Sequence, residues 1–238
     1  MLHPNHQFHP LEVLPTTGEP ILRLKGKGHE NIVLTPPRAR DAQYIVPILD
    51  DERVHPWISS VPHPYKLEDA EWWLGRVVPP SNAFLAELEA LKDKTNPVIV
   101  DACPVRAIRE LREDGSDVFL GDLVIDLAGQ WWELEGSGFT EQEVPIRGEE
   151  PDIWTIGDYL APSHHGRGIM SDALQTLIQE WAIPRMGVRK MVVTTLKDNK
   201  ASVRVFEKCG FSFRKTIEDA IEVRGERRGV HVLEWNHG

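Results

Sequence analysis

The sequence predicts a mixed α/β domain with a central, mostly antiparallel sheet, helices on both faces and one parallel pair of strands. Two observations support this prediction. IWTIGDYLA (153–161) and KMVVTTL (190–196) are strand-like, and the segment between them has apolar residues at helical spacing. A crossover helix returns the chain in the same direction, so these two strands are expected to pair in parallel. Strand-like runs elsewhere in the chain supply the rest of the sheet.

The length of 238 residues suits one large domain with a substantial core. We expect that domain over residues 21–238, preceded by a flexible, solvated N-terminal tail over residues 1–20. Three histidines in the tail are separated by prolines, which prevent a helix that would align the rings on a metal ion.

The charge balance restricts the partners. The chain has 37 acidic and 27 basic residues, a net charge of -10, which argues against a nucleic-acid-binding surface and favours cationic or amine partners. Two cysteines, Cys103 and Cys209, form no disulfide framework and are typical of a reducing compartment. We see no signal peptide and no run long enough to span a membrane, so a cytoplasmic protein without a membrane partner is expected.

In the first half of the chain, the sequence predicts two strands, two helices and three further strands, in that order. Pro47 is expected to break the first helix, and the second should end before Pro79. The predicted elements are strands ILRL (21–24) and NIVLTPP (31–37), helices RARDAQYIVPILDD (38–51) and KLEDAEWWLGRVV (66–78), and strands AFLAELEA (83–90), PVIVDACPVRAI (97–108) and DVFLGDLVIDL (117–127).

The second half begins with a long acidic insertion over residues 128–150. Its adjacent Trp131 and Trp132 are expected either to cover a substrate as a lid or to fasten the loop to the body of the protein. The elements that follow are strand 153–161, a helix from about Gly168 to Ile183, strand 190–196, a short helix ASVRVFEKC (201–209), and strands FSFRKTIE (211–218) and GVHVLEW (229–235).

The stretch PSHHGRGIMSDAL (162–174) places a Gly-rich turn between a strand and a helix, an arrangement that binds phosphate. No Walker string is present. Gly166 and Gly168 are followed by Ser171 where a dinucleotide fingerprint has a third small residue, so a nucleotide-dependent oxidoreductase stays a lesser alternative. His164 and His165 are adjacent and cannot easily chelate one ion, so no metal is expected.

The segment over 153–213, and IGDYLAPSHHGRGIMSDAL within it above all, closely resembles the acetyl-CoA-binding half of the GNAT N-acetyltransferases. More narrowly, it is similar to the RimJ/RimL-like branch of that family. The stretch HPWISSVPHPYKLEDAEWWL (55–74) also resembles the substrate-side helices of that branch. The resemblance implies a GNAT-like fold, acetyl-CoA as co-substrate, and direct acetyl transfer to a primary amine. The acceptor would be a small metabolite or a peptide N-terminus, and the protein a monomer or homodimer.

The resemblance also implies a set of cofactor-binding residues. The strand end would pair with the pantetheine arm, and the loop amides would hold the pyrophosphate. Asn199 would touch the CoA arm, although a helix N-cap is an equally good role for it. The residues are Tyr159, Leu160, Ala161, His165, Gly166, Arg167, Gly168, Ile169, Met170 and Asn199.

The catalytic groups are less clearly indicated. Many relatives place a tyrosine where this chain has Phe206, which is expected in the core, so Ser202 is the best remaining donor to the leaving thiolate. Because Phe206 lacks the hydroxyl of that tyrosine, a CoA-binding protein without catalytic activity remains an alternative function. For the general base, Asp152 ranks first, ahead of Asp158 and Asp126, because a carboxylate at a strand entry beside the cleft can be partly desolvated.

Overall fold

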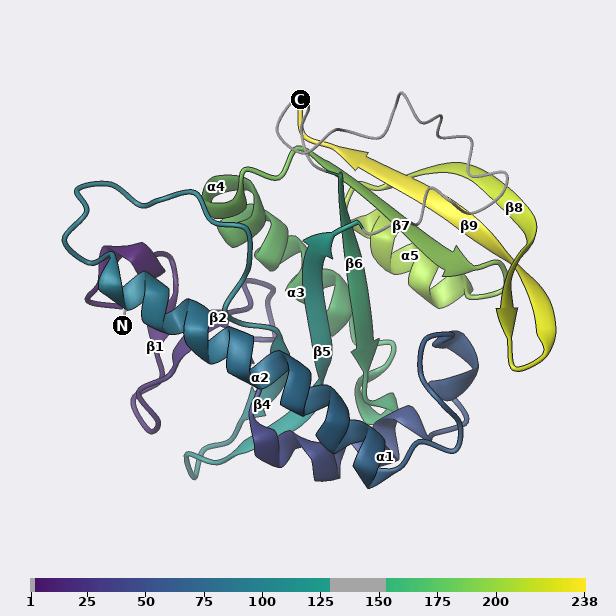
Figure 1. Cartoon of the computed structure of the whole chain (residues 1–238), viewed down its shortest axis with the longest axis horizontal. Helices are drawn as coiled ribbons and strands as arrows, with labels where there is room; N and C mark the ends of the chain where they lie inside the picture. Colours follow the sequence, from purple (N-terminus) through teal and green to yellow (C-terminus); the bar gives the residue numbers. More distant parts are fainter. Residues whose placement is uncertain (1–2, 129–152) are drawn as a thin grey trace. The chain divides into compact units, whose positions relative to one another are not determined.

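The computed structural model describes residues 3–128 and 153–238 (Figure 1). The chain divides into two compact units that alternate along the sequence. Unit 1 comprises Met1–Val124 and Asp158–Gly187, and unit 2 comprises Ile125–Gly157 and Val188–Gly238. The expectations for Trp131, Trp132 and Asp152 fall outside the described residues.

Among the described residues, nine strands follow the order β1-β2-β3-β4-β5-β6-β7-β9-β8, which confirms the predicted mixed α/β fold. Where the register is defined, the strand pairs are antiparallel except for β6 with β7. The strands are β1 Glu12–Val13, β2 Pro20–Arg23, β3 Ile32–Thr35, β4 Ala107–Leu111, β5 Asp117–Leu127, β6 Ile153–Leu160, β7 Lys190–Leu196, β8 Ser212–Val223 and β9 Glu226–Asn236.

The parallel pair forms where the sequence predicts it. Ile153 lies opposite Lys190, and Trp154 lies opposite Met191. Both residue pairs lie within unit 2, at the start of each strand.

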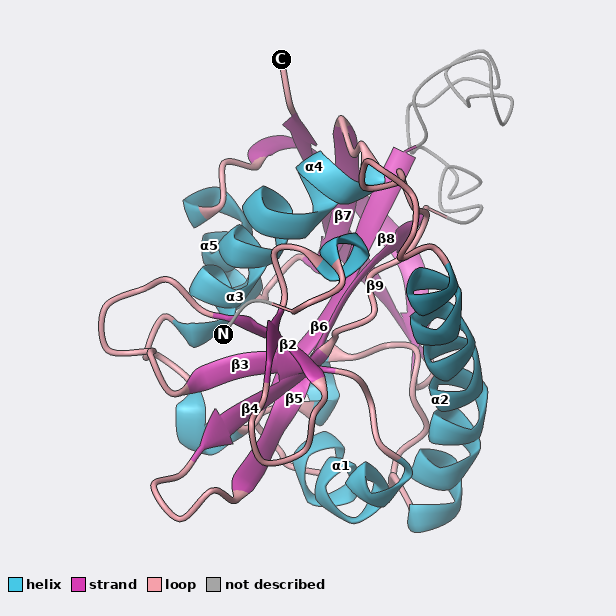
Figure 2. Ribbon diagram, turned by 90° about the vertical axis from the view of Figure 1, so that its left-hand side faces the viewer, coloured by secondary structure: helices cyan, strands magenta, loops and turns pink. Residues whose placement is uncertain are grey.

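The helices are α1 Ala42–Leu49, α2 Leu67–Ala90, α3 Ile169–Leu177, α4 Ile183–Met186 and α5 Lys200–Lys208. A π-helical turn, Ile178–Ala182, joins α3 to α4. Within unit 1, α1 and α2 lie on one side of strands β3 to β5, and α3 lies on the other (Figure 2). On the α1–α2 side, Ile45 of α1 and Leu74 of α2 belong to one buried cluster with Phe119 of β5.

Several predicted boundaries are wrong in this region. Helix α2 continues through Pro79 and Pro80 to Ala90, so the predicted strand over 83–90 is helical. Leu88 is fully buried, and its burial stabilises the part of the helix that follows the two prolines, although they disfavour the turn before them. Pro47 likewise lies inside α1. The predicted strand over 97–108 begins only at Ala107, because the prolines ahead of it lack the N–H that strand pairing requires.

The N-terminal segment differs from the solvated tail that the sequence predicts. It forms a 3-10 turn at His6–Phe8 and then β1, and it buries Phe8 and Leu11. The buried Arg185 donates hydrogen bonds to the carbonyl oxygens of Gln7 and His9. Apolar side chains and main-chain acceptors therefore attach this segment to the rest of unit 1.

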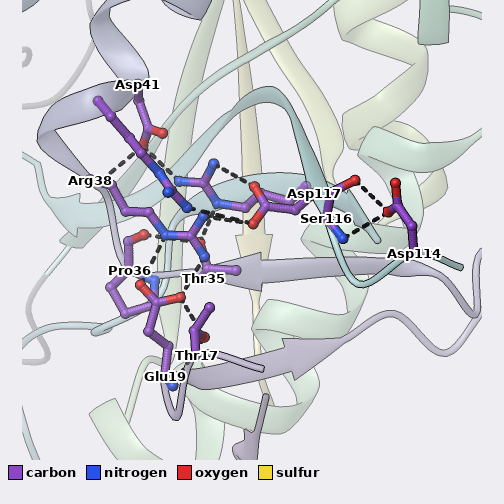
Figure 3. Close-up of polar contacts among 11 residues, drawn as sticks. Thr17, Glu19, Thr35, Pro36, Arg38, Asp41, Asp114, Ser116 and Asp117 are labelled. Carbon is purple, nitrogen blue, oxygen red and sulfur yellow. Dashed lines mark hydrogen bonds and ion pairs between the residues drawn. The ribbon is translucent and has the colours of Figure 1, made fainter. Parts of the chain in front are cut away.

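A network of charged side chains connects β4, β5 and the start of α1 (Figure 3). The guanidinium of Arg109, 1% exposed, contacts the carboxylates of Asp41 at 2.7 Å and Asp117 at 3.2 Å. Arg38 donates to Asp117 at 2.7 Å and also pairs with Glu19. Burial alone would raise the pKa of Asp117, but the hydrogen bond from Arg38 and the charge of Arg109 lower it. Asp117 is therefore a carboxylate held between two guanidinium groups.

Unit 2 is built on the β8–β9 hairpin and β7. Val192 of β7 and Val230 and Val232 of β9 are almost fully buried, in agreement with the apolar, β-branched sequence of these strands. Phe206 of α5 is 2% exposed and meets Phe211 edge-on at 5.2 Å, so its predicted place in the core is confirmed. No helix among residues 3–128 and 153–238 is long and apolar enough to cross a membrane.

Candidate functional site

The end of β6 lies unusually close to β5. The Ala161 amide donates to the carbonyl of Leu120, and a Cβ placed on Gly121 would lie 2.1 Å from the carbonyl oxygen of Tyr159. Real Cβ atoms essentially never approach that closely, so only glycine permits this spacing. Gly121 therefore sets the position of the Tyr159–Ala161 main chain, which the sequence predicts as one part of a binding site.

The Gly-rich turn follows directly. Gly166 and Gly168 have φ of 73° and 83°, in the left-handed region. A Cβ on Gly166 would meet nothing within 4 Å, and one on Gly168 would meet only a ring carbon of His29 at 3.8 Å. Gly168 is the N-cap of α3 and has no side chain to cap the first turn. The open main chain and the uncapped N–H groups of α3 fit a phosphate-bearing ligand.

The two histidines of the turn have different partners. His165 Nε2 donates to the carbonyl of Leu160 at 2.8 Å, which closes the turn back onto β6. His164 lies 2.9 Å from the hydroxyl of Ser163 and 3.7 Å from Glu110, and burial lowers its pKa despite that carboxylate. Within the described ranges, no group of three or more His, Cys, Asp or Glu residues is placed to hold a metal ion.

Two of the three candidate bases, Asp158 and Asp126, lie within the described residues, and Asp158 of β6 is the one whose pKa is shifted. Burial, followed by the negative charge of Asp122, raises its pKa to about 6. Asp122 itself is bound by Arg106 through bonds of 2.7 to 3.1 Å. Asp126 is exposed and accepts the amide of Leu127. The raised pKa distinguishes Asp158 from Asp126, and the sequence prediction for Asp152 stays untested.

Sequence reasoning missed Asp122 and Arg106. An acid in the middle of an apolar strand, as in VFLGDLVI, is a signal that could have indicated Asp122. Arg106 also lies over the ring of Trp73 at 5.6 Å, so this ion pair adjoins the α2 helix.

In unit 2, Asn199 forms the helix cap that the sequence allows. Its side-chain oxygen accepts the amide of Ser202 at 3.1 Å at the start of α5. Ser202 is half-buried on the first turn of that helix. The capping role of Asn199 is confirmed, and the hydroxyl of Ser202 stays a candidate donor.

Comparison with known proteins agrees with these features. A family model described as an acetyltransferase (GNAT) domain matches residues 31–212. The chain belongs to the GNAT acetyltransferase domain family, as the resemblance of its Gly-rich loop predicts. No curated protein matches the sequence.

Solved structures share the fold at low sequence identity. An acetyltransferase of the GNAT family from Bacillus anthracis has a TM-score of 0.61 and 12% identity, covering 91% of this chain and 98% of its own. The ribosomal-protein-S5-alanine acetyltransferase of Vibrio fischeri has a TM-score of 0.56 and 16% identity, covering 87% and 93%. RimJ of Mycobacterium smegmatis, in complex with CoA-disulfide, has a TM-score of 0.51 and 19% identity, covering 92% and 86%. The neighbours therefore include proteins of the RimJ/RimL type.

Proposed function

We propose that this protein is an acetyl-CoA-dependent N-acetyltransferase that modifies a primary amine by direct transfer. The observation that supports it best is the strand end, left-handed glycine turn and uncapped helix start at Tyr159–Met170, set in a GNAT fold. Two solved neighbours bind the corresponding ligands: RimJ is in complex with CoA-disulfide and MccE with acetyl-CoA.

The donor would be held mainly by main-chain groups. We assign the pantetheine arm to the backbone of Tyr159 to Ala161 and the pyrophosphate to the amides of His165 to Met170. The exposed side chain of Arg167 adds a positive charge at the turn. Once bound, acetyl-CoA would supply an activated acetyl thioester. Proton removal from the amine and protonation of the leaving thiolate would be carried out by side chains of this protein.

We assign the general base to Asp158. An amine attacks only when neutral, so a carboxylate within reach must accept its proton. With a pKa of about 6, Asp158 is ionised at neutral pH yet is a stronger base than an ordinary aspartate. Asp122, whose carboxylate pairs with Arg106 at 2.7 Å, is the neighbouring charge that adds to burial in raising the pKa of Asp158. Asp152 stays a prediction from the sequence.

Ser202 is our proposed donor to the leaving thiolate. Ser202→Ala should lower kcat by about tenfold or more, with little change in the Kd for acetyl-CoA, if its hydroxyl acts only on the departing sulfur. Equal losses in both would show a structural or ligand contact instead. Unchanged kinetics would assign the role to water.

The acceptor class follows from charge and from the neighbours. Structures with this fold include ribosomal-protein acetyltransferases and a spermidine N-acetyltransferase chimera. Both a peptide N-terminus and a small polyamine are cationic at neutral pH, and the net charge of -10 attracts either. We therefore propose a cationic primary amine as the acceptor.

Thermal shift followed by a thiol-release assay tests the proposal. A ligand that binds only the native state stabilises it, so acetyl-CoA and CoA should raise the Tm while NAD and ATP should not. A panel of polyamines, amino acids and peptides should then reveal at least one acceptor that releases CoA. Stabilisation by NAD alone would indicate the oxidoreductase alternative. CoA binding without thiol release for any amine would indicate a silent CoA-binding protein.

A further inference from the structure

The turn between β2 and β3, residues 25–30, contacts the first turns of α3 through one carboxylate. Asp172 accepts the Gly26 amide at 2.9 and 3.1 Å and lies 2.7 Å from Nδ1 of His29. The Thr176 hydroxyl donates to the same carboxylate at 3.3 Å. A Cβ on Gly26 would lie 2.3 Å from the Asp172 oxygen, so a side chain there would displace the carboxylate from its present contacts. The sequence motif KGKGHE is therefore a contact surface for α3.

The second ring nitrogen of His29 reaches the Gly-rich turn itself. His29 Nε2 lies 3.1 Å from the carbonyl oxygen of Arg167, between the two left-handed glycines. That carbonyl can only accept a hydrogen bond, and so can the ionised carboxylate of Asp172. A neutral imidazole has a single N–H and can donate to one of them. Both contacts are satisfied together only when His29 is a doubly protonated imidazolium.

We propose that His29 is a positioning residue for the donor site: as an imidazolium it fixes the Arg167 peptide through the Asp172 carboxylate, and CoA affinity therefore depends on its protonation. This inference rests on the proposed function. Loss of one proton releases either the helix contact or the turn contact, and the amides that face the pyrophosphate then lose their fixed orientation. The positive charge also lies at the phosphate-binding end of α3, where it favours an anion.

The surroundings of His29 support the cationic form. Asp172 of α3 faces Nδ1 directly, and both side chains are largely buried, at 13% and 14% exposed. Glu30, the next residue, has its pKa lowered first by the Gly28 amide and further by the charge of His29. Arg167 presents its carbonyl to the ring while its own side chain is exposed. One carboxylate therefore contacts the ring directly, and the neighbouring guanidinium is solvated.

Two neutral variants separate the two contacts. In His29→Gln the amide nitrogen can replace Nε2 and donate to Arg167, whereas in His29→Asn it can replace Nδ1 and donate to Asp172. Neither can do both. His231→Gln is the matched control, since His231 of β9 lies against the hydroxyl of Thr216 rather than a carboxylate. Calorimetric titration with CoA gives the Kd of each variant between about pH 5.5 and about pH 8.5, the range over which an imidazole changes charge.

The readout is the ratio of the variant Kd to the wild-type Kd at each pH. CoA has a phosphate that titrates near pH 6, and the ratio cancels this contribution. For both His29 variants we expect a ratio of about ten at the acidic end, the effect of one charge-assisted hydrogen bond, falling towards about one at the alkaline end. The control should stay near one throughout. A ratio that does not change with pH would overturn the role of His29, and the Tm of each variant at each pH verifies folding.

The protonation state can be measured independently of CoA. In the ¹⁵N-labelled protein, the ring nitrogens of His29, assigned by its absence in His29→Gln, should both be protonated at about pH 6. A neutral ring under those conditions would refute the imidazolium even if CoA binds. Conversely, a wild-type protein that has the imidazolium but binds no CoA at any pH would refute the proposed function and, with it, the role in donor binding.

Discussion

At the scale of single residues, Asp158 has the most specific chemical consequence. Asp158→Asn keeps the size of the side chain but cannot accept a proton, so kcat/KM should fall by about a hundredfold or more. In the wild type, kcat/KM should rise with pH and level off above a pKa near 6, because the ionised form is the base. The exposed Asp126→Asn is the control and should leave this acidic limb unchanged. An unaltered limb in Asp158→Asn would assign the proton to Asp152 or to water.

The same substitution should affect stability in the opposite sense. The pKa of Asp158 is raised from 3.8 to about 6 in the folded protein, so the ionised carboxylate disfavours folding. That cost is absent below about pH 4 and complete above about pH 6. Asp158→Asn should therefore raise the free energy of unfolding by about 1–2 kcal/mol at pH 8 and leave it nearly unchanged at pH 4. Denaturant titration at the two pH values measures the difference.

Gly168 tests the donor site at the same scale. Valine at a φ of 83° is strained, and its side chain would occupy the space beside the turn, so Gly168→Val should abolish CoA binding. Gly18→Val is the matched control, because Gly18 also has a positive φ, of 74°, and open space around it. Both variants should lose comparable stability, and only Gly168→Val should lose CoA by calorimetry. Normal CoA binding by folded Gly168→Val would mean that the loop is only a turn.

At the scale of secondary-structure elements, Gly121 governs how β5 meets β6. Gly121→Ala would place a methyl group against the Tyr159 carbonyl, so the two strands must separate and the Tyr159–Ala161 main chain must move. We expect a loss of about 2 kcal/mol or more in stability and weaker CoA binding. Gly75→Ala in α2 is the contrast: open space surrounds it, and alanine there should stabilise the helix by about 0.5–1 kcal/mol. Chemical denaturation should show a lower free energy of unfolding for Gly121→Ala and a higher one for Gly75→Ala.

A second prediction at this scale concerns the charge network of β4 and β5. Arg109→Met leaves Asp41 buried without its partner and should cost about 3–5 kcal/mol of unfolding free energy. Arg53→Met removes a surface partner of Asp51, a pair whose arginine is 67% exposed, and should have no measurable effect. A small effect for Arg109→Met would show that the carboxylates of the network take up protons when the arginine is removed.

The elements also show what the sequence can and cannot predict. β7 and α5 were recognised because a β-branched apolar run and an Asn cap are local signals. The extent of α2 was missed because burial of Leu88 outweighs two prolines, which is a tertiary effect. The glycine turn was found from its spacing, whereas His29 and Asp172 are 143 residues apart. Contacts between residues so far apart in the sequence produce no local sequence pattern, so the contact of His29 with Asp172 could be identified only from the structure.

At the scale of the whole molecule, the net charge of -10 sets the salt dependence of catalysis. With a polyamine acceptor, kcat/KM should fall several-fold between about 20 mM and about 300 mM NaCl, because salt screens the attraction. A zwitterionic amine of similar size should respond much less. An equal response of both acceptors would show that salt acts on the donor or on the fold instead of on steering.

The alternation of the two units along the chain has a consequence for biosynthesis. Unit 1 is complete only when residues 158–187 have been added, and these include Asp172, the partner of Gly26 and His29. A nascent chain that has just passed residue 124 therefore carries strands β3, β4 and most of β5 without the helix α3 that lies on one side of them (Figure 2). At about 5–20 residues per second, translation leaves that apolar surface uncovered for several seconds. Folding of unit 1 on the ribosome therefore cannot be completed before residues 158–187 have emerged.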